Sequence, residues 1–166
     1  GRILKELESD ETGKYVNSPE TPIFNKSRLL YGFSKTKNAI RETGTVLLVE
    51  GQMDFLMAWQ DGVKNVVATS GTALTPDHLR TLRRVADKII LGFDNDEAGL
   101  MAAERSIDLA GANDFNVYVL PFGEGEISAQ GGPQPKADEP RVQALGWKDP
   151  AELANSSPGK LAELMG

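Results

Sequence analysis

The sequence of 166 residues contains no cysteine and one histidine, His78. The lack of cysteine excludes disulfides and thiolate metal sites, and a single histidine argues against a zinc or iron centre built from imidazoles. No apolar run approaches the roughly 20 residues of a membrane-spanning helix, and no signal-peptide pattern opens the chain. We therefore expect a soluble, cytoplasmic protein with no membrane partner and no zinc in this chain.

Basic residues are outnumbered, at 18 Lys and Arg against 24 Asp and Glu, for a net charge of -6. Taken whole, this charge argues against a nonspecific nucleic-acid-binding protein. One segment reverses the balance, because residues 14–41 carry a single acid, Glu20, and the following basic residues: Lys14, Lys26, Arg28, Lys35, Lys37 and Arg41. With its neighbouring aromatic residues this segment either follows a phosphate backbone or is a solvated surface.

Apolar periodicity changes after Gly44, where strand-like and helix-like segments begin to alternate. They fall at 45–49 (strand), 53–61 (helix), 65–69 (strand), 76–86 (helix), 88–93 (strand), 97–110 (helix) and 115–120 (strand). This alternation predicts an α/β protein with a mainly parallel four-stranded sheet flanked by helices. The helix at 76–86 carries His78 among three arginines, which indicates a solvated face.

We divide the chain on these patterns into four parts. Residues 1–43 are a basic leading segment with a helix over 24–40 that is interrupted near Gly32, and residues 44–120 are the α/β body. Residues 121–148 are rich in glycine, proline and charge, and predict an inserted flexible loop. Residues 149–166 predict a short helical extension. Because the sequence opens without methionine, we expect it to be a fragment of a longer protein.

Three carboxylates follow two of the predicted strands. Glu50 ends the first strand, and Asp94 and Asp96 follow the third. The carboxyl ends of parallel strands form the crevice where open α/β sheets bind ligands, so these side chains should lie together. Clustered carboxylates repel one another unless a cation compensates them, and an open acidic crevice suits magnesium. The alternative is that Asp94 satisfies a neighbouring loop and Asp96 caps the following helix.

Other candidate residues have an ordinary structural explanation as well. Asp54 could face the same crevice, or only favour the dipole of its helix. Asp149 could be a late metal ligand, although capping the helix after it is sufficient. The turn containing Gly71 and Thr72 could hold a phosphate, or be only a tight turn.

The sequence resembles the Toprim domain, the catalytic fold shared by topoisomerases and bacterial primases, in three motifs: Val49-Glu50-Gly51-Gln52-Met53-Asp54, Ser70-Gly71-Thr72 and Phe93-Asp94-Asn95-Asp96-Glu97-Ala98-Gly99. Residues 14–32 resemble the end of the amino-terminal core subdomain of DnaG-type bacterial replicative primases. The resemblance covers residues 14–120 almost continuously.

This resemblance implies synthesis of short RNA primers on single-stranded DNA during replication, by Mg²⁺- or Mn²⁺-dependent nucleotidyl transfer. It implies Glu50, Asp94 and Asp96 as catalytic metal ligands, Asp54 as a further catalytic acid and Asp149 as a late ligand. It also implies nucleotide or template contacts at six positions: Lys14, Asn17, Lys26, Arg28, Gly71 and Thr72. Implied partners are the DNA template, ribonucleoside triphosphates and the RNA primer. A replicative helicase and single-strand-binding protein would bind through domains absent from this chain. The resemblance implies a location in the bacterial cytoplasm, at the replisome.

Two departures from the family bear on activity. The family usually has Asp-Pro-Asp where this chain has Asp149-Pro150-Ala151, so a late metal contact is missing or is supplied by Glu124, Glu126 or Glu152. The chain also lacks most of the catalytic core that precedes Toprim, so we expect a weak or inactive polymerase. Alternatives left open are another Toprim enzyme such as a topoisomerase or nuclease, a phosphatase using the Asp-x-Asp motif, and a metal-free nucleic-acid-binding module.

Overall fold

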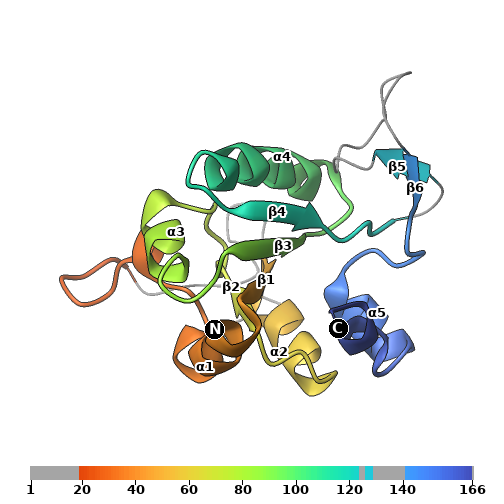
Figure 1. Cartoon of the computed structure of the whole chain (residues 1–166), viewed down its shortest axis with the longest axis horizontal. Helices are drawn as coiled ribbons and strands as arrows, with labels where there is room; N and C mark the ends of the chain where they lie inside the picture. Colours follow the sequence, from red (N-terminus) through yellow and green to blue (C-terminus); the bar gives the residue numbers. More distant parts are fainter. Residues whose placement is uncertain (1–18, 124–125, 129–140, 166) are drawn as a thin grey trace, which may run out of the picture.

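A four-stranded sheet lies at the centre of the molecule (Figure 1). The computed structural model describes residues 19–123, 126–128 and 141–165. The strands run in the order β2-β1-β3-β4, and every neighbouring pair is parallel. Their bounds are β1 (Thr45–Val49), β2 (Val66–Ala68), β3 (Lys88–Gly92) and β4 (Asn116–Val119). The predicted α/β class and parallel sheet are confirmed, and the strand order places the two strands that precede the acidic motifs side by side.

Helices cover both faces of this sheet because its strands are apolar on both sides. Alternate residues of β1 point to opposite faces, so Leu48 packs into one apolar cluster and Leu47 into the other. The first cluster is completed by α1 (Phe33–Thr43), α3 (Pro76–Leu82) and α4 (Glu97–Gly111), and the second by α2 (Gln52–Gln60), α5 (Pro150–Ser156) and α6 (Lys160–Met165). Within the described part of the chain, no helix is long and apolar enough to cross a membrane.

The segment before the sheet differs from the predicted helix over 24–40. It contains the short 3-10 helix η2 (Lys26–Arg28), and the α-helix α1 begins only at Phe33. Between them, Tyr31 is extended and exchanges backbone hydrogen bonds with Ala68 of β2 (2.8 and 3.2 Å). Gly32 then adopts a left-handed conformation (φ 81°) against the Phe55 ring, where a side chain would collide. The helical prediction was therefore wrong before Gly32, because a long-range strand contact determines this backbone.

A two-stranded antiparallel ribbon lies within residues 121–148, where the sequence predicts a flexible loop. It pairs β5 (Glu126–Ser128) with β6 (Arg141–Gln143). After the ribbon, the chain returns to the sheet edge, where Lys148 O accepts a hydrogen bond from Asn95 N at 3.0 Å. The carboxyl-terminal helices then dock on α2, because Asp61 accepts hydrogen bonds from Leu161 N (2.9 Å) and Ala162 N (3.3 Å). The return of the chain brings Asp149 close to the acidic loops.

Candidate metal centre

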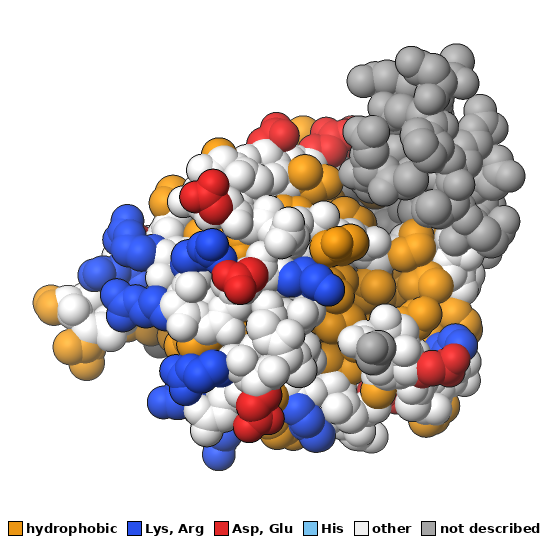
Figure 2. Space-filling model, in the orientation of Figure 1, with side chains coloured by type: hydrophobic (Ala, Val, Ile, Leu, Met, Phe, Trp, Pro, Cys, Tyr) orange, Lys and Arg blue, Asp and Glu red, His pale blue; other side chains and the backbone are white. Residues whose placement is uncertain are grey.

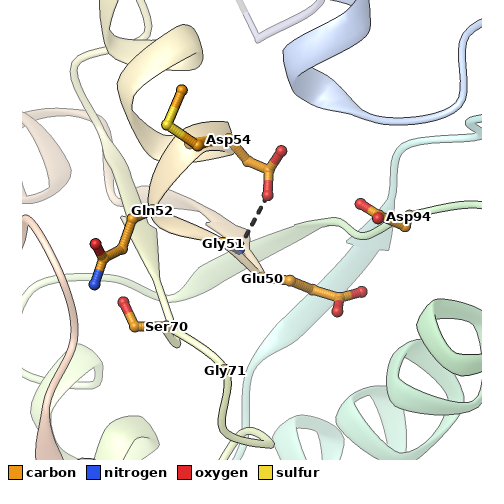
Figure 3. Close-up of a pocket in the computed structure, with 8 residues that line it drawn as sticks. Glu50, Gly51, Gln52, Asp54, Ser70, Gly71 and Asp94 are labelled. Atoms are coloured by element: carbon orange, nitrogen blue, oxygen red, sulfur yellow. Dashed lines mark hydrogen bonds between the residues drawn. The ribbon is translucent and has the colours of Figure 1, made fainter. Parts of the chain in front are cut away.

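An acidic pocket of about 450 Å³ opens at the carboxyl-terminal edge of the sheet (Figure 3). Glu50 follows β1 directly, Asp94 follows β3, and Asp54 lies in the first turn of α2. All three carboxylates line the pocket, as the close-up shows. The other lining residues are Gly51, Gln52, Met53, Ser70 and Gly71. The sheet topology therefore gathers acids that are distant in the sequence, as expected for loops at one edge.

Glu50 has the least compensated charge of the pocket. Its Oε1 atom is buried and has no hydrogen-bond partner among the described residues. Burial raises the pKa of Glu50 from 4.5 to about 7, and the negative charge of Asp94, followed by those of Asp96 and Asp54, adds to the shift. A hydrogen-bonding contribution from the Asp94 backbone opposes part of this rise in the pKa of Glu50, but a buried carboxylate with one unpartnered oxygen is still costly to ionise. The side chain is thus suited to a positively charged ligand.

Asp54 and Asp94 are also harder to ionise than isolated aspartates. Burial raises the pKa of Asp54 to about 6, although its Oδ2 accepts a hydrogen bond from Gly51 N at 3.0 Å, and the charges of Asp94 and Asp149 add to the rise. Burial likewise raises the pKa of Asp94, with a contribution from Asp149 that the nearby Lys148 partly offsets. Each carboxylate therefore experiences its neighbours as repulsive charges.

Asp96 and Asp149 both cap helices, as the structural alternative predicted. Asp96 Oδ1 accepts a hydrogen bond from Gly99 N at 2.8 Å and begins α4. Asp149 Oδ1 accepts one from Glu152 N at 2.7 Å and begins α5. Both charges act on the pocket without belonging to its described lining. A capping carboxylate has a second oxygen, so capping and cation binding are compatible.

The remaining candidate residues fall into four groups. Glu152 Oε2 accepts a hydrogen bond at 2.6 Å from the backbone N–H of Lys148, the residue before the N-cap Asp149. The Thr72 hydroxyl donates a hydrogen bond to Thr69 O at 3.0 Å, within its own turn. Gly71 lines the pocket and has a left-handed backbone conformation (φ 81°). Lys26 and Arg28 lie in η2, against α3. The last group lies outside the described residues and consists of Lys14, Asn17, Glu124 and the side chain of Glu126.

Two features of the site were missed by the sequence reasoning. Ser70 Oγ is buried without a hydrogen-bond partner in the described residues, and its backbone is left-handed (φ 58°). Gly99 lies so close to the acidic loop that a Cβ atom there would be 2.1 Å from Asp94 O and 3.0 Å from Glu50 Oε1. Both residues stand in the quoted motifs, but only their three-dimensional neighbours distinguish them from ordinary turn and helix positions.

The donor set fits a hard divalent cation held partly by other ligands. In the described ranges, no three Asp, Glu, His or Cys side chains are grouped closely enough to enclose a metal ion. Magnesium does not need such an enclosure, since it is usually bound by one or two carboxylates, several waters and substrate phosphates. The unpartnered Glu50 oxygen and the raised carboxylate pKa values are what such a cation would relieve. The chemistry of the pocket and the family expectation therefore agree.

Binding of Mn²⁺ is expected to weaken steeply as the pH falls through 7. A cation must displace the proton of Glu50, with a pKa of about 7, and that of Asp94, whose pKa is also raised, while a proton on Asp54, with a pKa of about 6, removes a negative charge that favours binding. Affinity should fall by about tenfold per pH unit just below 7, where one proton competes, and more steeply below 6, where further carboxylates become protonated. Calorimetric titration from pH 5.5 to 8 at constant ionic strength measures this. A constant affinity over that range would contradict the site.

The parallel sheet with acidic loops after β1 and β3 defines a Toprim-like domain, and a family model of that description matches residues 47–126. A second model, described as the amino-terminal domain of the DNA primase catalytic core, matches residues 1–37. The two matches follow one another in the order of the primase core. The chain therefore belongs to the DnaG-type bacterial primase family, as a part of its catalytic core that contains the Toprim domain.

Individual relatives agree with this assignment. The DNA primase of Enterococcus faecalis is 44% identical over 126 residues, which are 73% of this chain and 20% of that protein. A crystal structure of a DNA primase domain from Pseudomonas aeruginosa is 30% identical with a TM-score of 0.74, and the match covers 99% of this chain and 44% of that one. The structure of a DnaG primase catalytic domain bound to ssDNA is 29% identical with a TM-score of 0.69, covering 94% and 44%. This chain spans about a fifth of the length of the relatives it matches.

Proposed function

We propose that the chain is the Toprim part of a DNA primase, which joins ribonucleotides into short RNA primers on a single-stranded DNA template. The observation that carries the proposal is the acidic pocket of Glu50, Asp54 and Asp94, in which the pKa of each carboxyl is raised and Glu50 Oε1 has no hydrogen-bond partner among the described residues, in a chain of the primase family. The pocket matches a need of nucleotidyl transfer, because the reacting triphosphate is itself anionic. Only cations placed between the carboxylates and the phosphates make the two compatible.

The residues have distinct proposed roles. Glu50 and Asp94 bind Mg²⁺ or Mn²⁺, with Asp96 and Asp149 contributing their charges and second oxygens. When bound, the metal supplies activation of the attacking 3' hydroxyl and neutralisation of the triphosphate. Asp54 holds the loop after β1 through its bond to Gly51 N and adds negative charge to the site.

Substrate contacts are proposed outside the carboxylates. The left-handed turn at Gly71 brings its backbone to the pocket wall, where an amide can approach a phosphate without an intervening side chain. Thr72 flanks this turn. The basic segment supplies Lys14, Asn17, Lys26 and Arg28 to the template backbone, where cations neutralise phosphates regardless of sequence.

The organisation of the whole enzyme is proposed from the same family. Residues 1–43 end the preceding core subdomain, 44–120 form the Toprim body, 121–148 form an insertion that includes the β5–β6 ribbon, and 149–166 form a helical extension. Helicase and single-strand-binding protein would contact other parts of a longer primase, in the cytoplasm at the replisome. The 166-residue chain by itself should polymerise weakly, because it spans about a fifth of the length of the primases it matches.

The proposal is tested by incorporation of a radiolabelled ribonucleotide on single-stranded DNA, with Mn²⁺ and protein at concentrations stoichiometric with template. We expect slow incorporation that Asp94→Asn reduces by about a hundredfold, since a charge that stabilises the transition state is removed. Asp114→Asn is the matched control, because Asp114 is exposed and its left-handed backbone (φ 62°) suits asparagine. Incorporation that survives Asp94→Asn, or cleavage of the DNA in its place, would contradict the proposal.

A further inference from the structure

The lone histidine lies at a contact between α3 and the basic 3-10 helix η2. His78 is fully buried, so the predicted solvated face is wrong for this residue. Its Nε2 atom is 3.3 Å from Lys26 O. A carbonyl oxygen only accepts, so Nε2 must donate and the ring is the Nε2–H form when neutral. Burial lowers the pKa of His78, which keeps the ring neutral near pH 7.

The side chain of Thr75, the N-cap residue of α3, holds the adjacent carbonyl of η2. Thr75 Oγ1 donates to Ser27 O at 2.6 Å, and the same oxygen accepts from His78 N at 3.1 Å, so Thr75 caps α3 while it binds η2. The two contacts bridge 48 and 52 residues of sequence. Both are made to backbone oxygens, so they fix the path of η2 whichever side chains it carries.

The side chains of η2 are left available by this arrangement. None of the three residues of η2 is buried, and the Arg28 side chain is 69% exposed. Arg28 Nε lies 3.5 Å from Asp77 Oδ2, a surface contact that a phosphate can replace at little cost. Lys and Arg side chains gather at the end of the molecule formed by η2, α1 and α3 (Figures 1 and 2).

We propose that His78 and Thr75 are positioning residues, which hold the backbone of η2 so that its basic side chains face a single-stranded nucleic-acid backbone. The inference rests on the proposed function, and deepens it by assigning residues that touch neither nucleic acid nor metal. The loop between Ser70 and Thr75 gives the arrangement a further consequence. It lines the acidic pocket at one end and binds η2 at the other, so one short segment connects the proposed template surface with the pocket.

The test compares His78→Leu with His78→Gln. Leucine keeps apolar volume but removes the donor, whereas the Gln amide nitrogen restores a donor near the position of Nε2. Anisotropy of a labelled single-stranded oligonucleotide should show affinity reduced about fivefold by leucine and largely restored by glutamine. The salt dependence is the decisive readout, because each lost phosphate contact lowers the slope of log K against log salt by about 0.7 on single strands. Partial unfolding would lower the active concentration and leave that slope unchanged.

Arg28→Ala provides the coupling measurement. If His78 acts through η2, His78→Leu should cost much less in the Arg28→Ala background than in the wild type, because the contact it positions is already lost. Additive effects on affinity, or an unchanged salt slope in His78→Leu, would overturn the proposal and leave His78 as a core residue.

Hydrogen exchange separates failure of this inference from failure of the proposed function. The amides of Arg28 and Leu29 are bonded within the η2 turn, and we expect His78→Leu to speed their exchange at least tenfold while the β1 and β3 amides stay protected. If the wild-type chain bound no single-stranded DNA, the proposed template-binding role of η2 would be contradicted. The hydrogen-exchange rates would still show whether His78 holds the backbone of η2. Unchanged exchange at both amides would overturn the positioning role.

Discussion

Replacing Glu50 by glutamine is expected to weaken Mn²⁺ binding by at least tenfold while making the metal-free protein more stable. Glu50 is half-buried, its Oε1 has no hydrogen-bond partner in the described part of the chain, and its pKa is raised to about 7. Glutamine keeps the shape and removes the charge that the neighbouring carboxylates repel. If that relief is worth about 1 kcal/mol after solvent screening, the melting temperature rises by about 2–4 °C at pH 8.

The pH dependence of this stabilisation identifies its cause. The pKa of Glu50 is higher in the folded protein than its unfolded value of 4.5. The stability that a proton on Glu50 confers is therefore complete below 4.5 and lost as the pH rises through 7. The advantage of glutamine should be full above pH 7 and shrink towards pH 4.5. Melting curves of both proteins at pH 5 and pH 8 without metal measure it.

Glu104→Gln is the control, because Glu104 is an exposed residue of α4 and undergoes the same chemical change. It should alter neither the melting temperature nor Mn²⁺ affinity. The account of Glu50 fails if Glu50→Gln lowers stability at pH 8, since that result would mean that the carboxylate is compensated in the folded protein.

Replacing Gly99 by alanine should have the largest effect on the fold at the site. An added Cβ would lie 2.1 Å from Asp94 O, a backbone atom that cannot move without carrying the acidic loop with it. Overpacking of this kind costs about 3 kcal/mol, which corresponds to a fall of about 6–12 °C in melting temperature. Mn²⁺ binding should fall together with stability, because displacement of the loop moves Asp94 and crowds Glu50 Oε1.

Gly111 at the other end of α4 provides the matched control. A Cβ atom there meets no described atom within 4 Å, and alanine is the better helix former. Gly111→Ala should therefore leave the melting temperature unchanged or raise it, with normal Mn²⁺ binding. If Gly99→Ala behaved like Gly111→Ala, the close approach of α4 to the acidic loop would be contradicted.

The alternation of strands and helices after Gly44 was predictable because it depends on local patterns. Runs such as 45–49 are apolar and β-branched, and Thr75 with Pro76 marks a helix start whichever elements lie nearby. Strand order could not be predicted with the same means, because it depends on which apolar faces are covered. The helix predicted through 24–31 failed for a related reason, since Tyr31 instead bonds Ala68 of β2.

The location of the candidate site, at the carboxyl-terminal edge of the sheet, was predictable from the sequence. Loops that follow parallel strands meet at one edge of the sheet, and this rule predicted that Glu50 and Asp94 lie close together. In the structure both line one pocket, together with Asp54. Capping of helices by Asp96 and Asp149 was among the alternatives that the sequence offered, whereas the unpartnered oxygen of Glu50 depends on side-chain geometry that spacing does not encode. The burial of His78 was unpredictable likewise, because its partner Lys26 O lies 52 residues away. The catalytic and metal-binding roles of these residues stay predictions.

Titration of the chain with Mn²⁺, followed by NMR and calorimetry on the wild type and Asp94→Asn, tests the central claim most directly. We expect saturable binding, with paramagnetic broadening confined first to signals of residues 50–54, 70–71 and 94–96, and affinity reduced at least tenfold by the substitution. Mg²⁺ should compete for the same site. Absence of binding at millimolar Mn²⁺, or broadening that is unaffected by Asp94→Asn, would show that the carboxylates at this edge are structural and contradict the metal centre.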